Sequence, residues 1–190
     1  MFILYSVLIG FVLGLLVGGR PAGLAGLQVR WSWVILGGLL TQVVLFSAPV
    51  SERIGAFGPP IYVASTLAVL AAILANRAIR GLLVVAVGAA SNLAAIVSNG
   101  GYMPADPAAM AALAKFDPTV YSNSAVLADP ALAPLTDIFA LPMWLPFANV
   151  FSIGDVIIGC GVSMSIVLAM RSGRGPVTSA VPLPGSAAGA

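Results

Sequence analysis

The sequence predicts an all-α integral membrane protein with five transmembrane helices. First, 60% of its 190 residues are hydrophobic and only 7% are charged, whereas a soluble domain carries about 25% charged residues. Second, five apolar stretches approach the length of about 20 residues that a helix needs to cross a bilayer. Third, arginines gather in alternate loops between these stretches. A chain of this kind is expected to use a bilayer as its solvent.

The five predicted spans occupy residues 2–19, 32–49, 60–76, 81–98 and 151–170. The first lacks the charged start and the small-residue cleavage site of a secretory signal, so we expect a retained helix. The spans and a long segment, 99–150, form a single membrane domain, 1–170. The remaining residues, 171–190, are rich in Pro, Gly, Ser and Ala and are expected to be a disordered tail.

The basic residues predict the orientation of the chain. Six arginines and no acidic residue lie in the loops after the first, third and fifth spans: Arg20, Arg30, Arg77, Arg80, Arg171 and Arg174. Cytoplasmic loops carry an excess of Lys and Arg. We therefore expect a multi-pass protein of a bacterial inner (plasma) membrane, with its N-terminus outside, its C-terminus in the cytoplasm and segment 99–150 outside.

This outer segment is predicted to contain one or two short helices. Asp106 can cap a helix that has Pro107 in its first position, and Asp129 with Pro130 repeats the signal. Long loops in compact folds are often lids or binding loops. The segment is therefore expected to cover whatever site lies at the outer face.

Most polar side chains of the predicted spans fall in the outer half of the membrane. Asp155 is the most informative, because a carboxylate at membrane depth is costly and usually faces a protein interior or a water-filled cavity. It could also cap the fifth span, and the amides could simply join helices. The candidate ligand or pocket residues are Asn92, Asp155, Gln42, Asn99, Tyr102 and Asn149.

The first span carries Gly10, Gly14 and Gly18, spaced four residues apart. Small residues at this spacing let two helices approach closely. The ridge could pack within the chain's own bundle or form the seam of a homodimer.

Several kinds of site are excluded by composition. The chain has no histidine, which removes His-ligated haem, the common zinc sites and Ser-His triads. No phosphate-binding loop and no basic patch with interleaved aromatics occurs. We therefore predict no cofactor, no metal site and no nucleic acid. The expected partners are membrane lipids, with a larger membrane complex or a homo-oligomer left open.

Four stretches resemble the landmarks of an uncharacterised bacterial multi-pass membrane family, a domain of unknown function. They are "GGRPAGLAGLQVRW" at 18–31, "SNGGYMP" at 98–104, "LTDIFALP" at 135–142 and "FSIGD" at 151–155. The resemblance covers nearly the whole chain except the tail. It implies five spans and no established activity, so it transfers no catalytic residues.

A weaker similarity is to the lipoprotein signal peptidases, which are aspartyl enzymes of the outer bilayer face. It rests on "GAASNLAA" at 88–95, "TDIF" at 136–139 and "FANVFSIGD" at 147–155. The similarity places Asp155 where one catalytic aspartate stands, but Ala95 occupies the place of the other. Asp137 is the nearest replacement for the missing carboxylate.

Three functions follow as hypotheses. The first is a non-enzymatic accessory or binding protein whose outer polar pocket takes a lipid, quinone, pigment or partner helix. The second is an outer-leaflet hydrolase in which Asp155 and Asp137 act as an acid–base pair. The third is a small transporter subunit, although the inner half offers no polar path.

Overall fold

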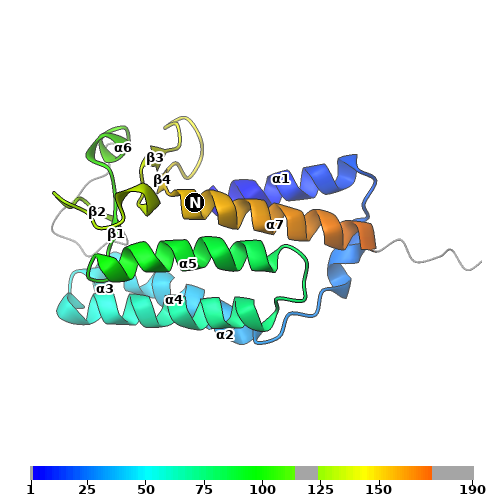
Figure 1. The fold of residues 1–190 in the computed structure, drawn as a ribbon, viewed down its shortest axis with the longest axis horizontal. Coiled ribbons are helices and arrows are strands. Elements are labelled where there is room, and N and C mark those ends of the chain that lie inside the picture. Colours follow the sequence, from blue (N-terminus) through cyan, green and yellow to red (C-terminus); the bar gives the residue numbers. More distant parts are fainter. Residues whose placement is uncertain (1, 114–123, 173–190) are drawn as a thin grey trace, which may run out of the picture.

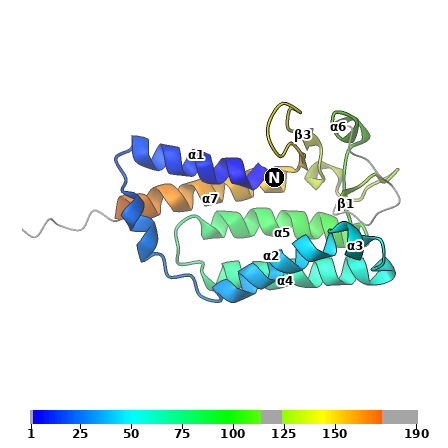
Figure 2. The same ribbon diagram turned by 180° about the vertical axis from the view of Figure 1, so that it is seen from behind.

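Five long helices lie side by side in the structure, a computed structural model that describes residues 2–113 and 124–172. Figures 1 and 2 show them as a row with the short elements of the outer segment at one end. The long helices are α1 (Phe2–Leu16), α2 (Ser32–Leu45), α4 (Gly58–Ala75), α5 (Leu82–Ser98) and α7 (Ile153–Ser172).

The helices are not arranged in chain order. α7 lies between α1 and α5, α5 packs in turn on α4, and α4 packs on α2. α1 therefore has α7 as its main partner, and α2 lies over α4, where Leu45 at the end of α2 also packs near α5.

Two stretches of described helix are long and apolar enough to cross a membrane. They are Ile153–Ser172 and the helical run Gly55–Ala75, which joins the 3-10 turn η2 (Gly55–Phe57) to α4. α1, α2 and α5 have only 15, 14 and 17 residues. The prediction of five full-length spans is therefore not supported by helix length.

The shortened helices have local causes. α1 ends in a turn in which Gly18 adopts a φ of +74°; there the N–H of Gly19 donates to the Gly14 carbonyl over 2.8 Å, a pattern that terminates helices. α2 ends at Leu45, and Pro49 lies within the first turn of the separate helix α3 (Ala48–Ser51). A proline inside one continuous helix would remove a backbone hydrogen bond, so the predicted span at 32–49 is divided.

At its other end, the chain stays helical slightly longer than expected. α7 includes Arg171 and Ser172, whereas the sequence prediction places these two residues in the tail. The rest of the predicted tail lies outside the described residues.

The remaining elements are short and connect the long helices. They are η1 (Pro21–Gly26), β1 (Met103–Pro104), α6 (Pro107–Ala111), β2 (Ser124–Ala125), η3 (Ala133–Leu135), β3 (Phe139–Ala140) and β4 (Val150–Phe151). β1 pairs with β2 in parallel, and β3 pairs with β4 in antiparallel fashion. Two-residue strands carry no periodic pattern, so sequence periodicity could not predict them.

The outer segment contains the first of its predicted helices. The Asp106 carboxylate accepts hydrogen bonds from the N–H groups of Ala108 and Ala109, at 2.8 and 3.1 Å, and Pro107 opens α6. The second prediction is wrong in detail: η3 begins at Ala133, and the residue before it, Leu132, has a φ of +53°. Asp129 is therefore not its cap.

Small residues set the spacing of the helices. A side chain added at Gly10 would place its Cβ 2.7 Å from the Ser163 Cα of α7, and one at Gly14 would overlap the Met170 sulfur. Within the chain, these two glycines thus face α7. Gly18 does not extend this ridge, because it lies in the turn after α1.

Two apolar clusters join the outer segment to the helices. Met103 is buried with Leu45, Tyr62, Ala95 and Ile96, so it is part of a core between α2, α4 and α5. A second cluster lies within the outer segment itself and contains Ala105, Ala109, Leu113, Ala148 and Val150. The described residues of the outer segment, 99–113 and 124–150, therefore form a packed cap on the helices.

Candidate functional site

The clearest polar cluster joins α5 to the start of α7. The Asn92 amide donates to the Asp155 Oδ1 atom over 2.9 Å. The Ser152 hydroxyl donates to the Asn92 Oδ1 atom over 2.8 Å. Three side chains from two segments, 60 residues apart in the chain, thus form one hydrogen-bonded group.

The same cluster caps α7. The Ser152 N–H donates to the second Asp155 oxygen over 3.0 Å, and the Asp155 N–H donates to the Ser152 hydroxyl oxygen over 3.1 Å. This reciprocal pair is a capping box with aspartate in the usual place of glutamate. It agrees with the alternative that Asp155 caps the fifth predicted span.

The close approach of the helices depends on Gly154. A Cβ at this position would overlap the Asn92 side-chain oxygen, and a Cβ at Gly88 would lie 2.5 Å from the Gly154 carbonyl oxygen. Only residues without side chains fit here. The "SIGD" stretch therefore supplies the cap, the close contact and the carboxylate together.

Gln42 lies elsewhere. Its amide donates to the Ser65 and Thr66 hydroxyls of α4, at 3.3 and 3.2 Å. Gln42 therefore joins α2 to α4, whereas Asn92 and Asp155 join α5 to α7. The structure thus places Gln42 in a second site, and the six candidates do not form a single pocket.

Asn99 fastens the outer segment to α5. Its amide donates to the carbonyls of Ala95, at 2.7 Å, and Ala131, at 2.9 Å, and its oxygen accepts from the Ala131 N–H at 2.9 Å. The turn that follows has positive φ values at Gly100 and Gly101, as helix-ending turns require.

Tyr102 and Asn149 are both half-buried. The Tyr102 N–H donates to the Asn99 carbonyl over 3.4 Å, so this residue continues the turn. The Asn149 side-chain amide donates to the Val150 carbonyl over 2.6 Å. The main-chain carbonyl of Asn149 accepts from the Leu141 N–H. Both residues thus belong to the packed outer segment.

Asp137, the proposed replacement for the missing carboxylate, is buried in the outer segment. Its main chain joins two parts of the outer segment: its N–H donates to the Pro104 carbonyl at 2.9 Å, and its carbonyl accepts from the Asp106 N–H at 3.0 Å. This bridge brings "LTDIFALP" beside "NGGYMP".

Two side chains with central contacts are absent from the predicted set. Ser152 is fully buried at the cluster described above. Asn76, at the end of α4, exchanges two hydrogen bonds of 2.7 Å with the backbone of Arg30 and donates a third to the Ala72 carbonyl. The Ser-x-x-Asp spacing could have indicated the cap, but no sequence signal pairs Asn76 with Arg30.

The surface of α2 and α4 carries two adjoining apolar hollows. One has a volume of about 380 Å³ and the other about 390 Å³. They share Gly37, Thr41 and Ile61, and we call their combined length the α2–α4 groove. Its walls are the residues Trp33, Val34, Gly37, Gly38, Leu40, Thr41, Val44, Leu45, Val50, Ile54, Ile61, Ala64, Ser65 and Ala68.

The polar groups of these sites are satisfied internally. The Thr41 hydroxyl donates to the Gly37 carbonyl and the Ser65 hydroxyl to the Tyr62 carbonyl. Each oxygen of Asp155 accepts a hydrogen bond. Among the described residues, no group of three or more His, Cys, Asp or Glu side chains could hold a metal ion.

Comparison with known proteins gives a family but no activity. A family model described as a family of unknown function, DUF5317, matches residues 26–167. No curated protein and no solved structure matches the chain, so the similarity to lipoprotein signal peptidases gains no support. The match covers α2 to α7 and confirms the resemblance to an uncharacterised family. The chain is thus a member of the DUF5317 family.

Proposed function

We propose that this chain is a non-enzymatic accessory protein of the bacterial inner membrane, in which five helices span the bilayer. We propose further that it binds the apolar chain of a lipid or an isoprenoid quinone along the α2–α4 groove. The groove itself carries this proposal, because it is a long hollow whose polar groups are already bonded within the protein.

Exposed apolar side chains support a membrane location. Leu8 of α1 is 59% exposed, Leu36 of α2 is 67% exposed and Val43 of α2 is 68% exposed. Only 22% and 28% of the two candidate spanning windows are buried, whereas a core helix of a soluble protein is mostly buried. A lipid bilayer would cover these apolar surfaces, which supports the proposed location.

The three shorter helices can still cross. A helix of 14 to 17 residues is about 21 to 26 Å long, against a hydrocarbon core of about 30 Å. Short spans are accommodated by local thinning of the bilayer at a modest cost. α3 and the turns after α1 and α5 continue the chain beyond the ends of these helices.

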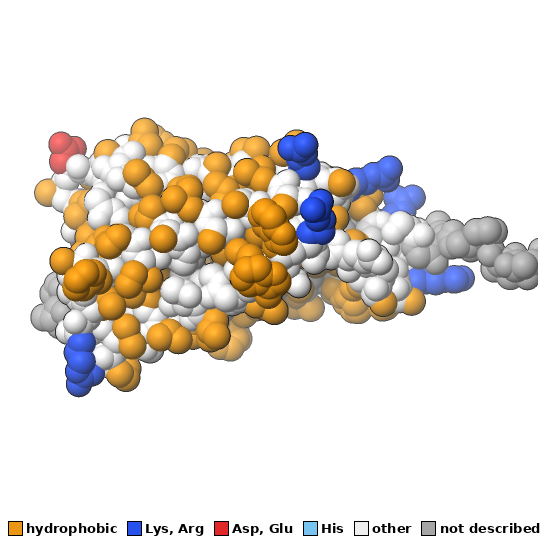
Figure 3. Space-filling view, turned by 90° about the horizontal axis from the view of Figure 1, so that it is seen from below, with side chains coloured by type: hydrophobic (Ala, Val, Ile, Leu, Met, Phe, Trp, Pro, Cys, Tyr) orange, Lys and Arg blue, Asp and Glu red, His pale blue; other side chains and the backbone are white. Residues whose placement is uncertain are grey.

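The charges favour the orientation with the C-terminus in the cytoplasm. Arg20 and Met170 share a backbone hydrogen bond, and Arg30 is bonded to Asn76, next to Arg77. The basic loops thus meet at the end of the row opposite the outer segment. Figure 3 shows one face of the molecule, on which most Lys and Arg side chains lie toward one end and many of the other side chains are apolar. Positive loops stay in the cytoplasm.

The groove favours an apolar ligand over a polar one. Gly37 lies on its floor, and a Cβ added there would meet no atom within 4 Å. Gly37 is therefore not in a tight contact with another helix, and the space beside it can hold a hydrocarbon chain. A hydrocarbon tail can fill it without leaving any buried polar group unpaired.

Native mass spectrometry of gently extracted protein tests the proposal. Wild-type protein is expected to retain a lipid or quinone, and Gly37→Phe is expected to lose it because the ring fills the groove. Leu36→Phe adds a ring on the neighbouring exposed position of α2, outside the groove lining, and serves as the matched control. Equal ligand retention by wild type and Gly37→Phe would refute the groove as the binding site.

A further inference from the structure

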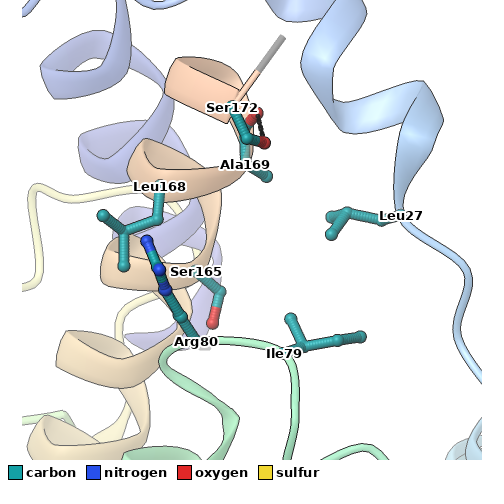
Figure 4. Close-up of a pocket in the computed structure, with 7 residues that line it drawn as sticks. All are labelled: Leu27, Ile79, Arg80, Ser165, Leu168, Ala169 and Ser172. Atoms are coloured by element: carbon teal, nitrogen blue, oxygen red, sulfur yellow. Dashed lines mark hydrogen bonds between the residues drawn. The ribbon is translucent and has the colours of Figure 1, made fainter.

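A separate cavity lies at the arginine-rich end of the row. It has a volume of about 290 Å³ and is lined by Leu27, Ile79, Arg80, Ser165, Leu168, Ala169 and Ser172. Figure 4 shows Leu27 and Ile79 across the opening from the end of α7, with the Arg80 side chain extending beside Leu168. Three segments thus supply its walls: the link after η1, the turn between α4 and α5, and the last turns of α7.

The position of Arg80 is fixed by its neighbour. Gly81 has a φ of +97°, and a Cβ there would lie 2.6 Å from the Gly161 carbonyl of α7 and would also overlap the Ser165 hydroxyl. The backbone of the turn is therefore in direct contact with α7. This contact fixes the backbone of the turn next to Arg80 against α7, and the Arg80 side chain extends beside Leu168.

The charge around the cavity is entirely positive within the described residues. Arg20, Arg30, Arg77, Arg80 and Arg171 lie at this end, and the described acidic residues lie toward the other end or in the outer segment. Among the described residues, none of these guanidinium groups makes a hydrogen bond or an ion pair. These exposed guanidinium groups can therefore bind anions from outside the chain.

The hydroxyl groups that line the cavity are not available to donate to a bound anion. The Ser165 hydroxyl donates to the Gly161 carbonyl, and the Ser172 hydroxyl donates to the Ala169 carbonyl, each over 2.8 Å. Each hydroxyl has one hydrogen to donate, so Arg80 is the group that can bind an anion here. Leu168 lies beside its side chain, and Leu27 and Ile79 line the opposite side of the cavity.

We infer that this cavity binds the phosphate headgroup of an anionic phospholipid from the inner leaflet. A guanidinium fork matches phosphate oxygens, and basic pockets between spans on the cytoplasmic side suit such headgroups. The apolar wall accommodates the start of an acyl chain, which a free phosphate ion lacks. The inference rests on the proposed membrane orientation and is independent of the ligand of the α2–α4 groove.

The test uses the full chain in nanodiscs of equal phosphatidylcholine and phosphatidylglycerol, followed by native mass spectrometry of retained lipid. We expect wild type to retain phosphatidylglycerol in preference. Arg80→Gln should lower the ratio of the two lipids about five-fold, as one basic charge near an anionic surface is lost. Arg53→Gln removes an arginine at the opposite end and should leave the ratio unchanged. Soluble glycerol phosphate should not displace the lipid.

A second variant keeps the test decisive if Arg80→Gln fails to fold. Leu168→Trp fills the cavity and keeps every charge, so it too should lower phosphatidylglycerol retention. An unchanged ratio in the variants that fold would overturn the inference, as would displacement by glycerol phosphate. Wild type that does not enter nanodiscs would instead refute the proposed function, and wild type that enters without lipid preference refutes this inference alone.

Discussion

The side chains of Asn92 and Asp155 meet across 2.9 Å, although 63 residues separate them in the chain. Asn92 lies on α5, and Asp155 lies in the first turn of α7. The bond therefore joins a helix in the middle of the row to the helix that also holds α1. Its loss should affect the arrangement of three helices.

A double-mutant cycle measures this bond. Asn92→Ala and Asp155→Ala should each lower the free energy of unfolding in detergent, and the double variant should be less destabilised than the sum. Interhelical hydrogen bonds of this kind contribute about 1 kcal/mol, and we expect a coupling energy of that size. Strictly additive losses would contradict the assigned contact.

Removal of the Ser152 hydroxyl should destabilise the start of α7. Ser152→Ala removes the cap of the Asp155 N–H and the bond to the Asn92 oxygen, and caps alone contribute about 1 kcal/mol. Thermal unfolding followed by circular dichroism measures the effect. Ser172→Ala removes a single hydroxyl bond at the other end of α7 and should change stability less, because Ser152 makes two such bonds. Similar losses in both variants would argue against the cap.

Substitution by alanine should lower the free energy of unfolding at Gly10 but not at Gly37. Each substitution raises helix propensity by about 1 kcal/mol, but the Cβ of Gly10→Ala collides with the backbone of Ser163, whereas that of Gly37→Ala meets open space. We expect a net loss of about 1 to 2 kcal/mol for Gly10→Ala, from overpacking, and no loss for Gly37→Ala. The free energy of unfolding in detergent provides the measurement, and a stabilised Gly10→Ala would disprove the close contact of α1 with α7.

Asn76 and Asn99 should each protect one distant backbone amide. Asn99→Ala removes the acceptor of the Ala131 N–H, and Asn76→Ala removes that of the Arg30 N–H. Hydrogen exchange at the corresponding amide should become about five-fold faster, the effect of a bond of about 1 kcal/mol. Each variant is the control for the other, because the effects should stay at opposite ends. Exchange that rises equally at both amides would indicate general unfolding instead.

Thiol labelling tests the proposed orientation. In a Cys160→Ser background, Glu52→Cys and Ala78→Cys each provide a single thiol at an exposed position. Glu52 follows α3, before α4 begins, and Ala78 lies beyond the other end of α4. A membrane-impermeant maleimide added to intact spheroplasts should label Glu52→Cys and spare Ala78→Cys until the membrane is opened. The reverse pattern would invert the proposed topology.

Much of the helical framework could be predicted from hydropathy alone. The predicted span at 81–98 differs from α5 by one residue, because Gly81 and Asn99 mark its ends in the sequence. The Asp106 cap was equally readable, since capping depends on residues within one turn. The early end of α2 was missed because the apolar run continues past it into α3.

The composition of the site was harder to predict. Depth along a helix follows from residue count, and it correctly grouped Asn92 with Asp155. It wrongly added Gln42, because depth carries no information on which neighbour a helix faces, and α2 lies on α4. The role of Asn76 depends on the backbone of Arg30, 46 residues away, and backbone partners leave no trace in residue type.

The pairing of α1 with α7 has a consequence for biosynthesis. Ser163 donates to the Ser6 carbonyl across 157 residues, so α1 meets this partner only after α7 has been synthesised. Until then the Gly10 face of α1 lacks its contact with Ser163 of α7. The entropy of closing so long a loop grows only slowly with its length, so the finished contact is affordable, but the waiting time is set by translation. The contact between α1 and α7 can therefore form only after α2, α4 and α5 have been synthesised.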